Sequence, residues 1–347
     1  MVDVRAGAGS LSETDRRVPA PTSDAWSRFW AGGAPHSCAG SFGTRYGGAI
    51  GRWWIDAFAA LDDRFVVLDV GTGGGPLPRL LVERAAGGLD RMPLIHAVDL
   101  ATVVFGWIPD PPPPWAARIV LHPNTAAESL PLPAASVDFV CSQFGIEYAD
   151  PDRSIAEVLR VLKPTGRAAF VVHAADSVLA AVAADELAHI EWLVGEIDWI
   201  NRVKAMLVPM ALAATADGRD ALRHDPVARA ARDAFNSAMR ALQLRAANSP
   251  IPDALLDASE VAMAIFRQSS THGAEIASSA LDAWAVALDD ARIRQRGLIS
   301  AAFDRVRLER FCSRFLEAGR SVDVKRLEHE NGQTLAWGLQ IAALANG

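Results

Sequence analysis

A glycine-rich turn that directly follows a buried strand can grip the charged end of a nucleotide-like ligand. Residues 65–76 read FVVLDVGTGGGP, so an apolar run ends at Asp69 and the glycines begin at Gly71. Asp69 would repel a pyrophosphate, but it suits a ligand that carries an ammonium or sulfonium group. The glycines allow close approach of the backbone, and the N-terminus of the helix predicted at residues 77–86 favours a carboxylate. This stretch therefore predicts a strand, a ligand-binding turn and a helix.

A second acid stands at the end of the next predicted strand. Residues 93–100 read PLIHAVDL, and the strand predicted there ends at Asp99. Asp99 follows Asp69 by thirty residues, which is the length of one βαβ unit. A carboxylate in that place can accept hydrogen bonds from both hydroxyls of a ribose. The alternative is a solvated acid at a strand end. Prolines at 109–114 then interrupt the helical pattern, and a short third strand is predicted at residues 118–121.

The most diagnostic pattern lies in residues 124–173. It runs in the order NTAAESLPLP, VDFVCS, QFGIEY, SIAEVLRVLKP and GRAAFVVH, which predicts a loop, a buried strand, a polar strand end, a helix that stops near Pro164, and another buried strand. With the D-x-G-x-G-x-G turn, this order resembles the class I S-adenosylmethionine (SAM) methyltransferases over about residues 65–173. The strand end S-Q-F-G-x-E-Y resembles one bacterial group among them.

The resemblance implies an α/β fold of the Rossmann-like class I type, with a mostly parallel sheet and an antiparallel edge hairpin. It implies SAM as cofactor and S-adenosylhomocysteine as product. The cofactor-binding residues that we expect are Asp69, Gly71, Thr72, Gly73, Gly75, Asp99, Leu100, Ala127, Glu128, Ser142 and Gln143.

Two positions depart from the family pattern. Ala126 stands where many relatives carry an acid that bonds the adenine amino group, so adenine recognition falls to backbone amides, Asn124 or Thr125. Thr165 replaces a glycine in the motif that ends the helix, which is a structural position.

The chain of 347 residues is long for one plain α/β domain. We expect a disordered tail, an aromatic-rich helical cap, a SAM-binding core, a helical insertion that acts as a lid, and a last helix with a closing β-hairpin turned by Asn331-Gly332. Their expected bounds are 1–23, 24–60, 61–173, 174–300 and 301–347. The aromatic helices of the cap could cover the sheet, or they could cover the cofactor and form part of the substrate wall.

Methyl transfer from a sulfonium is an in-line displacement, so the protein must mainly align the acceptor and exclude water. A base is needed only when the acceptor enters protonated. Three candidate catalytic residues lie near strand ends: His173, Glu147 and Tyr148.

We favour His173 as general base or orienting group, because an imidazole titrates near working pH; its alternative is a histidine that caps a strand. Glu147 could hold the SAM ammonium or the substrate, or pair with an arginine of the helical segment. For Tyr148, packing is favoured over catalysis.

Composition narrows the class of protein. The net charge is −7, with 34 basic and 41 acidic residues, which disfavours nucleic acid as a partner. The sequence shows neither an apolar run that could span a membrane nor the apolar core of a signal peptide, so we expect a cytoplasmic protein with no membrane partner. The three cysteines have no metal spacing, and we expect no metal.

The sequence thus predicts a SAM-dependent methyltransferase for a small organic acceptor, such as a quinone-like compound or a secondary metabolite. A homodimer is compatible with this reading, although no heptad pattern requires one. The alternative is a non-catalytic SAM-binding or partner-binding protein whose helical segment is an interface. A nicotinamide oxidoreductase is a third reading, against which Asp69 and the LPLP and LKP segments both count.

Overall fold

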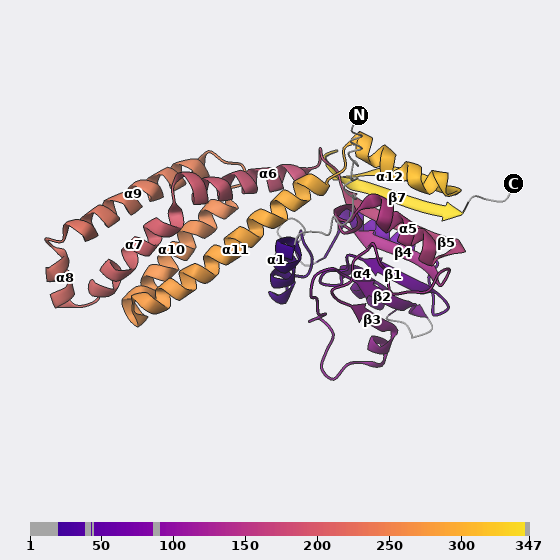
Figure 1. Cartoon of the computed structure of the whole chain (residues 1–347), viewed down its shortest axis with the longest axis horizontal. Coiled ribbons are helices and arrows are strands. Elements are labelled where there is room, and N and C mark those ends of the chain that lie inside the picture. Colours follow the sequence, from indigo (N-terminus) through magenta and orange to yellow (C-terminus); the bar gives the residue numbers. More distant parts are fainter. Residues whose placement is uncertain (1–19, 39–42, 44, 86–90, 344–347) are drawn as a thin grey trace, which may run out of the picture.

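A seven-stranded sheet with the strand order β3-β2-β1-β4-β5-β7-β6 is the centre of the fold (Figure 1). The computed structural model describes residues 20–38, 43, 45–85 and 91–343. Strands β1 to β5 pair in parallel, and β7 runs antiparallel to both β5 and β6. The predicted class, a mostly parallel sheet with an antiparallel edge hairpin, is confirmed. The strands are β1 (Val66–Val70), β2 (Leu94–Val98), β3 (Ile119–His122), β4 (Val137–Gln143), β5 (Leu162–His173), β6 (Arg320–Glu328) and β7 (Thr334–Ala343).

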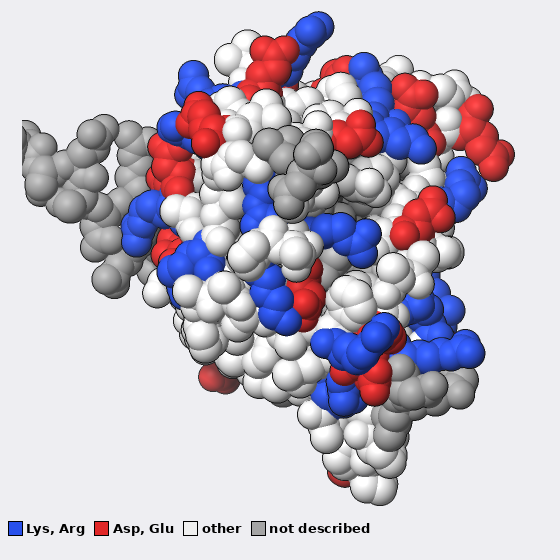
Figure 2. Space-filling view, turned by 90° about the vertical axis from the view of Figure 1, so that its right-hand side faces the viewer, with Lys and Arg blue, Asp and Glu red and all other residues white. Residues whose placement is uncertain are grey.

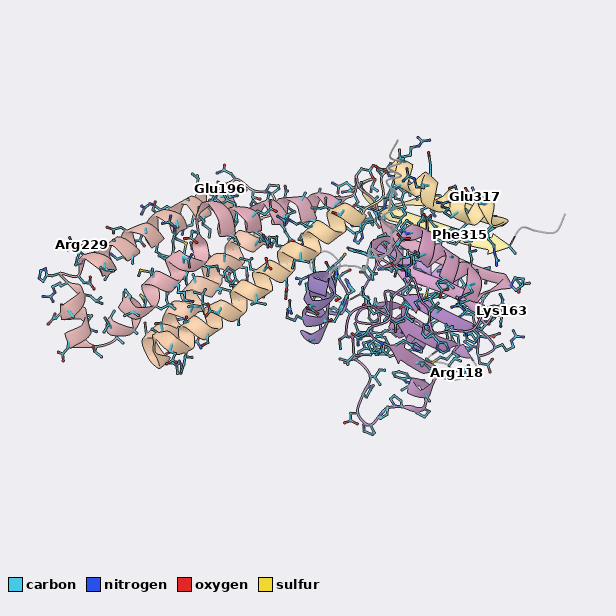
Figure 3. The ribbon with its side chains drawn as sticks, in the orientation of Figure 1. Arg118, Lys163, Glu196, Arg229, Phe315 and Glu317 are labelled. Atoms are coloured by element: carbon cyan, nitrogen blue, oxygen red, sulfur yellow. The ribbon has the colours of Figure 1, made fainter. Side chains whose placement is uncertain are left out.

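Helices cover both faces of this sheet, which explains why its central strands are apolar almost throughout. Successive residues of a strand point to opposite faces. Leu68 and Val70 of β1 pack toward α5 and α12, while Val67 packs toward α3 and α4. Phe315 of α12 is fully buried in the first of these layers (Figure 3). The covering elements are α3 (Gly48–Phe58), α4 (Pro76–Arg84), α5 (Pro151–Val161) and α12 (Arg305–Glu317), with short helical turns η2 (Pro114–Arg118) and η3 (Ile146–Tyr148).

The segment between β5 and α12 forms a helical arm that projects away from the sheet (Figure 1). Glu196 and Arg229 lie on it in Figure 3. It has a hydrophobic core of its own, which includes Trp199, Phe235 and Phe266. The arm consists of α6 (Val178–Glu191), the π-helical turn η4 (Trp192–Glu196), α7 (Trp199–Leu212), α8 (Ala216–Leu222), α9 (Pro226–Ala247), α10 (Asp253–His272) and α11 (Ala274–Ala301).

Two element boundaries differ from those predicted. Helix α1 (Ala20–Ala31) begins four residues before the expected start of the helical cap at residue 24, and residues 1–19 of the expected tail lie outside the described residues. Helix α5 ends at Val161 and not at Pro164. Lys163, the residue before Pro164, avoids helical geometry, so the helix cannot continue to the proline. Leu162 pairs with Val137 and begins β5.

The charged surface shows no segregation on the face drawn in Figure 2, where basic and acidic side chains lie interspersed. Several exposed arginines pair with neighbouring acids, as Arg314 does with Asp152 and Arg296 with Glu191. No helix in the described part of the chain is both long and apolar enough to cross a membrane.

The glycine turn after β1 generates a stability prediction. Gly71 has φ +69°, and a Cβ there would lie 2.7 Å from the Cα of Gly145. Gly319, which follows α12, has a similar φ of +71° but no atom within 4 Å of the added Cβ. We expect Gly319→Ala to cost about 1–2 kcal/mol of unfolding free energy from backbone strain alone. Gly71→Ala should cost about 1–3 kcal/mol more, because it also overpacks the contact with Gly145.

Urea denaturation of both variants measures the difference. Equal losses of unfolding free energy in the two would show that the contact between the turn and Gly145 carries no steric constraint.

Candidate functional site

One cavity of about 490 Å³ opens at the carboxyl ends of the parallel strands, where ligands bind in open α/β sheets. Segments far apart in the sequence form its wall. They are α1, the chain at His36 and Ser37, Tyr46, the glycine turn, the segments after β2, β3 and β4, the end of α11 and Arg307 of α12. Of the helical arm, therefore, only the last turns of α11 reach the cavity, at Gly297, Ser300 and Ala301.

The glycine turn lines the cavity through Gly71, Thr72 and Gly73, while Gly75 does not line it. A Cβ on Gly73 would lie 2.4 Å from the indole of Trp30, and one on Gly75 would lie 2.6 Å from Phe105. The glycines thus let aromatic side chains of neighbouring segments pack onto the turn. Gly75, with φ +76°, precedes the first residue of α4.

Asp99 follows the last residue of β2 and lines the cavity. Its Oδ2 accepts the backbone N–H of Gly73 at 2.7 Å, and its Oδ1 accepts that of Ala101 at 2.8 Å. Burial raises the pKa of Asp99 to about 6, although both backbone hydrogen bonds act in the opposite direction. A carboxylate has about four lone-pair sites, so each oxygen can still accept a further hydrogen bond.

Asp69 occupies a different place from the one expected of a ligand-binding acid, because it does not line the cavity. Val67, two residues earlier in β1, packs toward α3 and α4. Because side chains alternate along a strand, Asp69 points to the same face. There the Sγ of Cys141 lies 3.8 Å from Oδ1 of Asp69. The side chain is 2% exposed. Burial, opposed mainly by a hydrogen bond from Thr72, raises the pKa of Asp69 to about 7.

The segment after β3 supplies the adjoining wall with Thr125, Ala126, Ala127 and Glu128, and Leu100 lies in the same wall. The carboxylate of Glu128 accepts the backbone N–H of Asp150, just before α5, at 2.8 Å.

Ser142 and Gln143, at the end of β4, have separate roles. Ser142 is fully buried and does not line the cavity; its hydroxyl donates to the carbonyl of Val70 and accepts from the N–H of Ile146. Gln143 does line the cavity, and its Oε1 accepts the indole N–H of Trp54. Because an indole only donates, this bond fixes which end of the amide is oxygen.

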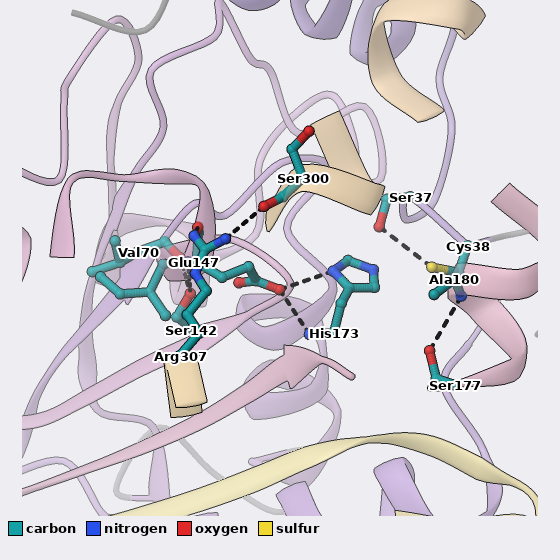
Figure 4. A network of polar contacts seen from close by, with 11 residues as sticks. Ser37, Cys38, Val70, Ser142, Glu147, His173, Ser177, Ala180, Ser300 and Arg307 are labelled. Atoms are coloured by element: carbon teal, nitrogen blue, oxygen red, sulfur yellow. Dashed lines mark hydrogen bonds and ion pairs between the residues drawn. The ribbon is translucent and has the colours of Figure 1, made fainter. Parts of the chain in front are cut away.

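Glu147 and His173 form a buried pair beside the cavity (Figure 4). Oε1 of Glu147 lies 2.9 Å from Nδ1 of His173 and accepts the backbone N–H of the same residue at 3.0 Å. Oε2 of Glu147 has no hydrogen-bond partner in the described part of the chain. Glu147 lines the cavity, whereas His173 lies behind it, with its ring stacked on Phe144 at 4.0 Å between centroids.

The protonation of His173 follows from its two neighbours. Burial alone would lower the pKa of this imidazole, but the neighbouring Cys38 and the hydrogen-bonded Glu147 raise it to about 9. This pKa favours the protonated ring at neutral pH, in which Nδ1–H donates to Glu147, while Nε2 has no hydrogen-bond partner in the described part of the chain. The geometry gives the contact with the cavity to Glu147, and His173 holds Glu147 in place.

The two aromatic helices of the N-terminal region divide the roles that the sequence left open. Trp53 and Trp54 of α3 belong to the core of the sheet. Trp26 and Trp30 of α1 line the cavity, and Trp26 meets Tyr148 edge to face.

Helix α1 is held over the cavity by α11. Arg28 donates two hydrogen bonds to the carboxylate of Asp290, at 2.6 and 2.7 Å, and Asp290 is 4% exposed. Arg294 lies over the ring of Phe29 at 4.5 Å. These contacts fix α1, whose Trp26 and Trp30 line the cavity.

Sequence reasoning did not identify several wall residues, namely His36, Ser37, Tyr46, Gly297, Ser300, Ala301 and Arg307. They lie in a loop or on long helices whose local patterns resemble those of any surface helix. No group of three or more His, Cys, Asp or Glu side chains among the described residues is arranged to hold a metal ion.

Comparison with known proteins finds similarity to methyltransferases in one part of the chain. Residues 68–170 match a family model described as a methyltransferase domain. An uncharacterized methyltransferase of Mycobacterium tuberculosis is 38% identical over 110 residues, which are 32% of this chain and 40% of the relative. A biotin biosynthesis bifunctional protein of Cellvibrio japonicus is 33% identical over 127 residues, covering 35% of this chain and 22% of that protein. The chain thus spans at most about two fifths of these curated relatives.

Solved structures give weaker matches. A SAM-dependent methyltransferase from Aquifex aeolicus is 22% identical, covers 35% of this chain and 62% of its own, and has a TM-score of 0.29. The 1,6-didemethyltoxoflavin-N1-methyltransferase of Burkholderia thailandensis is 19% identical, with coverage of 49% and 68% and a TM-score of 0.35.

The family model covers the glycine turn, Asp99 and the end of β4, which are the parts that meet at the cavity. Residues 68–170 are therefore similar to a methyltransferase domain, of a family whose members take their methyl group from S-adenosylmethionine.

Proposed function

We propose that this protein transfers a methyl group from SAM to a small organic acceptor held in the cavity. The main support is that the glycine turn, Asp99 and Glu147 line one cavity, and that the buried Oε2 of Glu147 has no hydrogen-bond partner in the described part of the chain. Its volume of about 490 Å³ lies within the range of small-molecule sites. The indoles of Trp26 and Trp30 in the wall favour an acceptor with an apolar body, of a quinone-like or secondary-metabolite kind.

The residues beside the glycine turn fit the cofactor. Asp99 would accept the ribose hydroxyls with the lone pairs that Gly73 and Ala101 leave free. Leu100, Ala127 and Glu128 would bound the adenosine portion, and residues 71–73 with Gln143 would bound the remainder. Ser142 would act indirectly by joining β1 to η3, and Gly75 by leaving room for Phe105 to pack on the turn. Asp69 lies outside the cavity, and we assign it no contact with the cofactor. SAM supplies a methyl group on a sulfonium sulfur, which keeps the electron pair of the broken S–C bond.

Glu147 is the residue that we assign to the acceptor. Its Oε2 can accept a hydrogen bond from an acceptor O–H or N–H and take the proton as the new bond to the methyl carbon forms. The imidazolium of His173 orients Oε1 and balances the charge of the carboxylate. Burial raises the pKa of Tyr148 well above its usual value, so its phenol stays neutral and packs against Trp26.

The state of Asp99 predicts how cofactor affinity depends on pH. With a pKa of about 6 in the free protein, the carboxylate becomes protonated as the pH falls. Ribose hydroxyls donate to the ionised form, so lowering the pH from 7.5 to 5 should weaken S-adenosylhomocysteine binding about tenfold. Isothermal titration across this range measures the effect.

Asp99→Asn should weaken binding at pH 7.5 and remove most of this dependence. Asp69→Asn is the matched control: it changes a buried acid with a raised pKa at the next strand, but outside the cavity, and should retain the affinity and its pH profile. A flat profile in the unmodified protein would exclude Asp99 as the ribose ligand.

A second prediction concerns Glu147. Glu147→Gln keeps the shape of the side chain but cannot take up a proton, so we expect turnover to fall about 10²–10⁴-fold while S-adenosylhomocysteine affinity stays within twofold. Glu191→Gln, at an exposed ion pair on the arm, serves as the isosteric control. Retained turnover in Glu147→Gln would remove this residue from proton transfer.

The experiment that tests the function itself has two stages. Titration with SAM, S-adenosylhomocysteine and NADH should give micromolar binding of the two adenosyl ligands only. An acceptor screen that measures S-adenosylhomocysteine formation by mass spectrometry should then identify a substrate. Adenosyl binding with no product from any acceptor would favour the alternative of a non-catalytic SAM-binding protein, and no adenosyl binding would refute the proposal.

A further inference from the structure

Arg307 is a half-buried cation in the wall of the cavity whose bonds leave its charge without an ionic partner. Its Nη2 donates to the backbone carbonyl of Glu147 at 2.8 Å, and its Nη1 donates to that of Ser300 at 2.5 Å. Figure 4 shows the guanidinium lying beside Glu147. A guanidinium carries five N–H donors, so three remain.

The ion pairs of the described residues include none to Arg307, in contrast to Arg28, whose guanidinium is bidentate with Asp290. Burial lowers the pKa of Arg307, and only the more distant charges of Glu147 and Asp304 oppose this. Removing an arginine from water without an anion is costly, and planar anions such as carboxylates fit its fork of donors. The cavity side of Arg307 is therefore suited to an anionic group.

Glu147, whose backbone carbonyl Arg307 binds, lines the same wall, and its Oε2 is buried and has no hydrogen-bond partner in the described part of the chain. Glu147 would repel an anion, but the imidazole of His173 behind it, whose pKa is raised, offsets that charge. Among the other acids of the wall, Asp99, Glu128 and Asp150 each accept a backbone N–H and lie in the segments after β2, after β3 and before α5. Asp304 does not line the cavity, and its carboxylate accepts the backbone N–H of Arg307 at 2.7 Å.

Small and aromatic residues line the cavity near these two side chains, the guanidinium and the Glu147 carboxylate. Gly297 and Ala301 stand one turn apart on α11 and line the cavity, while Trp26 and Tyr148 line it from α1 and η3. An added Cβ on Gly297 would already reach the ring of Tyr148 at 3.5 Å. Aromatic side chains such as these favour an acceptor with an aromatic ring, which can stack on them or meet them edge to face.

We infer that the acceptor is a small planar acid whose carboxylate binds Arg307 and whose reacting hydroxyl or amine donates its hydrogen to Oε2 of Glu147. This inference rests on the proposed function and narrows its substrate class. Transfer forms the bond from the acceptor's oxygen or nitrogen to the methyl carbon. It breaks the S–C bond with its electrons left on sulfur, and it moves the acceptor's proton to Glu147.

Titration of the full chain saturated with S-adenosylhomocysteine tests this inference. The probes are 2-, 3- and 4-hydroxybenzoate, each paired with its neutral hydroxybenzamide. We expect at least one acid to bind tenfold or more tightly than its amide. Arg307→Gln should weaken that acid tenfold or more, leave the amide unchanged, and keep S-adenosylhomocysteine affinity within twofold. Arg305→Gln, on the same helix but exposed and paired with Glu309, is the matched control and should change nothing.

Three results would overturn the inference: equal binding of acids and amides, no binding of any hydroxybenzoate, or an equal loss for both classes in Arg307→Gln. The last would show that Arg307 only ties Glu147 to Ser300. Failure of the unmodified protein to bind S-adenosylhomocysteine would instead refute the proposed function, so the two failures are distinguishable.

Discussion

The site depends on the close backbone contact between Gly71 and Gly145. A Cβ on Gly145 would lie 2.8 Å from the carbonyl oxygen of Val70, so neither position has room for a side chain. The hydroxyl of Ser142 reinforces the contact by bonding the carbonyl of Val70 and the N–H of Ile146 together. The ends of β1 and β4 are thereby held at van der Waals distance. For this reason the glycine turn and Glu147 face a single cavity and not two separate ones.

A second layer of the site comes from outside the sheet. Helix α1 is bound to α11 by the pair Arg28–Asp290, across 262 residues of sequence. Removing Arg28 would leave the buried carboxylate of Asp290 without this partner, so the pair specifies where α1 lies more than it adds stability. Through this pair, the arm affects a cavity that it touches only at the end of α11.

The acids of the site show how position decides role. Asp69 and Asp99 stand at the ends of neighbouring strands, and burial raises the pKa of both. Asp69 lies within β1 and follows its alternation toward α3 and α4, whereas Asp99 lies past the end of β2 and faces the cavity. Glu147 lines the cavity as well; its carboxylate is buried, with one oxygen paired with His173 and the other without a hydrogen-bond partner in the described part of the chain.

The sequence by itself determined the class of the fold, and it pointed to the glycine turn and Asp99, which line the cavity. These features can be recognised in the sequence because residues close together in the chain create them. They are the strand periodicity, the glycine turn, Asp99 and the Asn-Gly hairpin. The sequence also pointed to Glu147 and Tyr148 in the remaining wall, but the rest of that wall was decided by tertiary structure. Trp26 and Ser300 meet there because α1 packs on α11, and Arg307 joins them through its bond to the carbonyl of Ser300. Nothing in the local sequence of Ser300 and Arg307 distinguishes them from other helical residues. The exchange of roles between His173 and Glu147 also needed the structure, because burial and the two partners of His173 set its protonation.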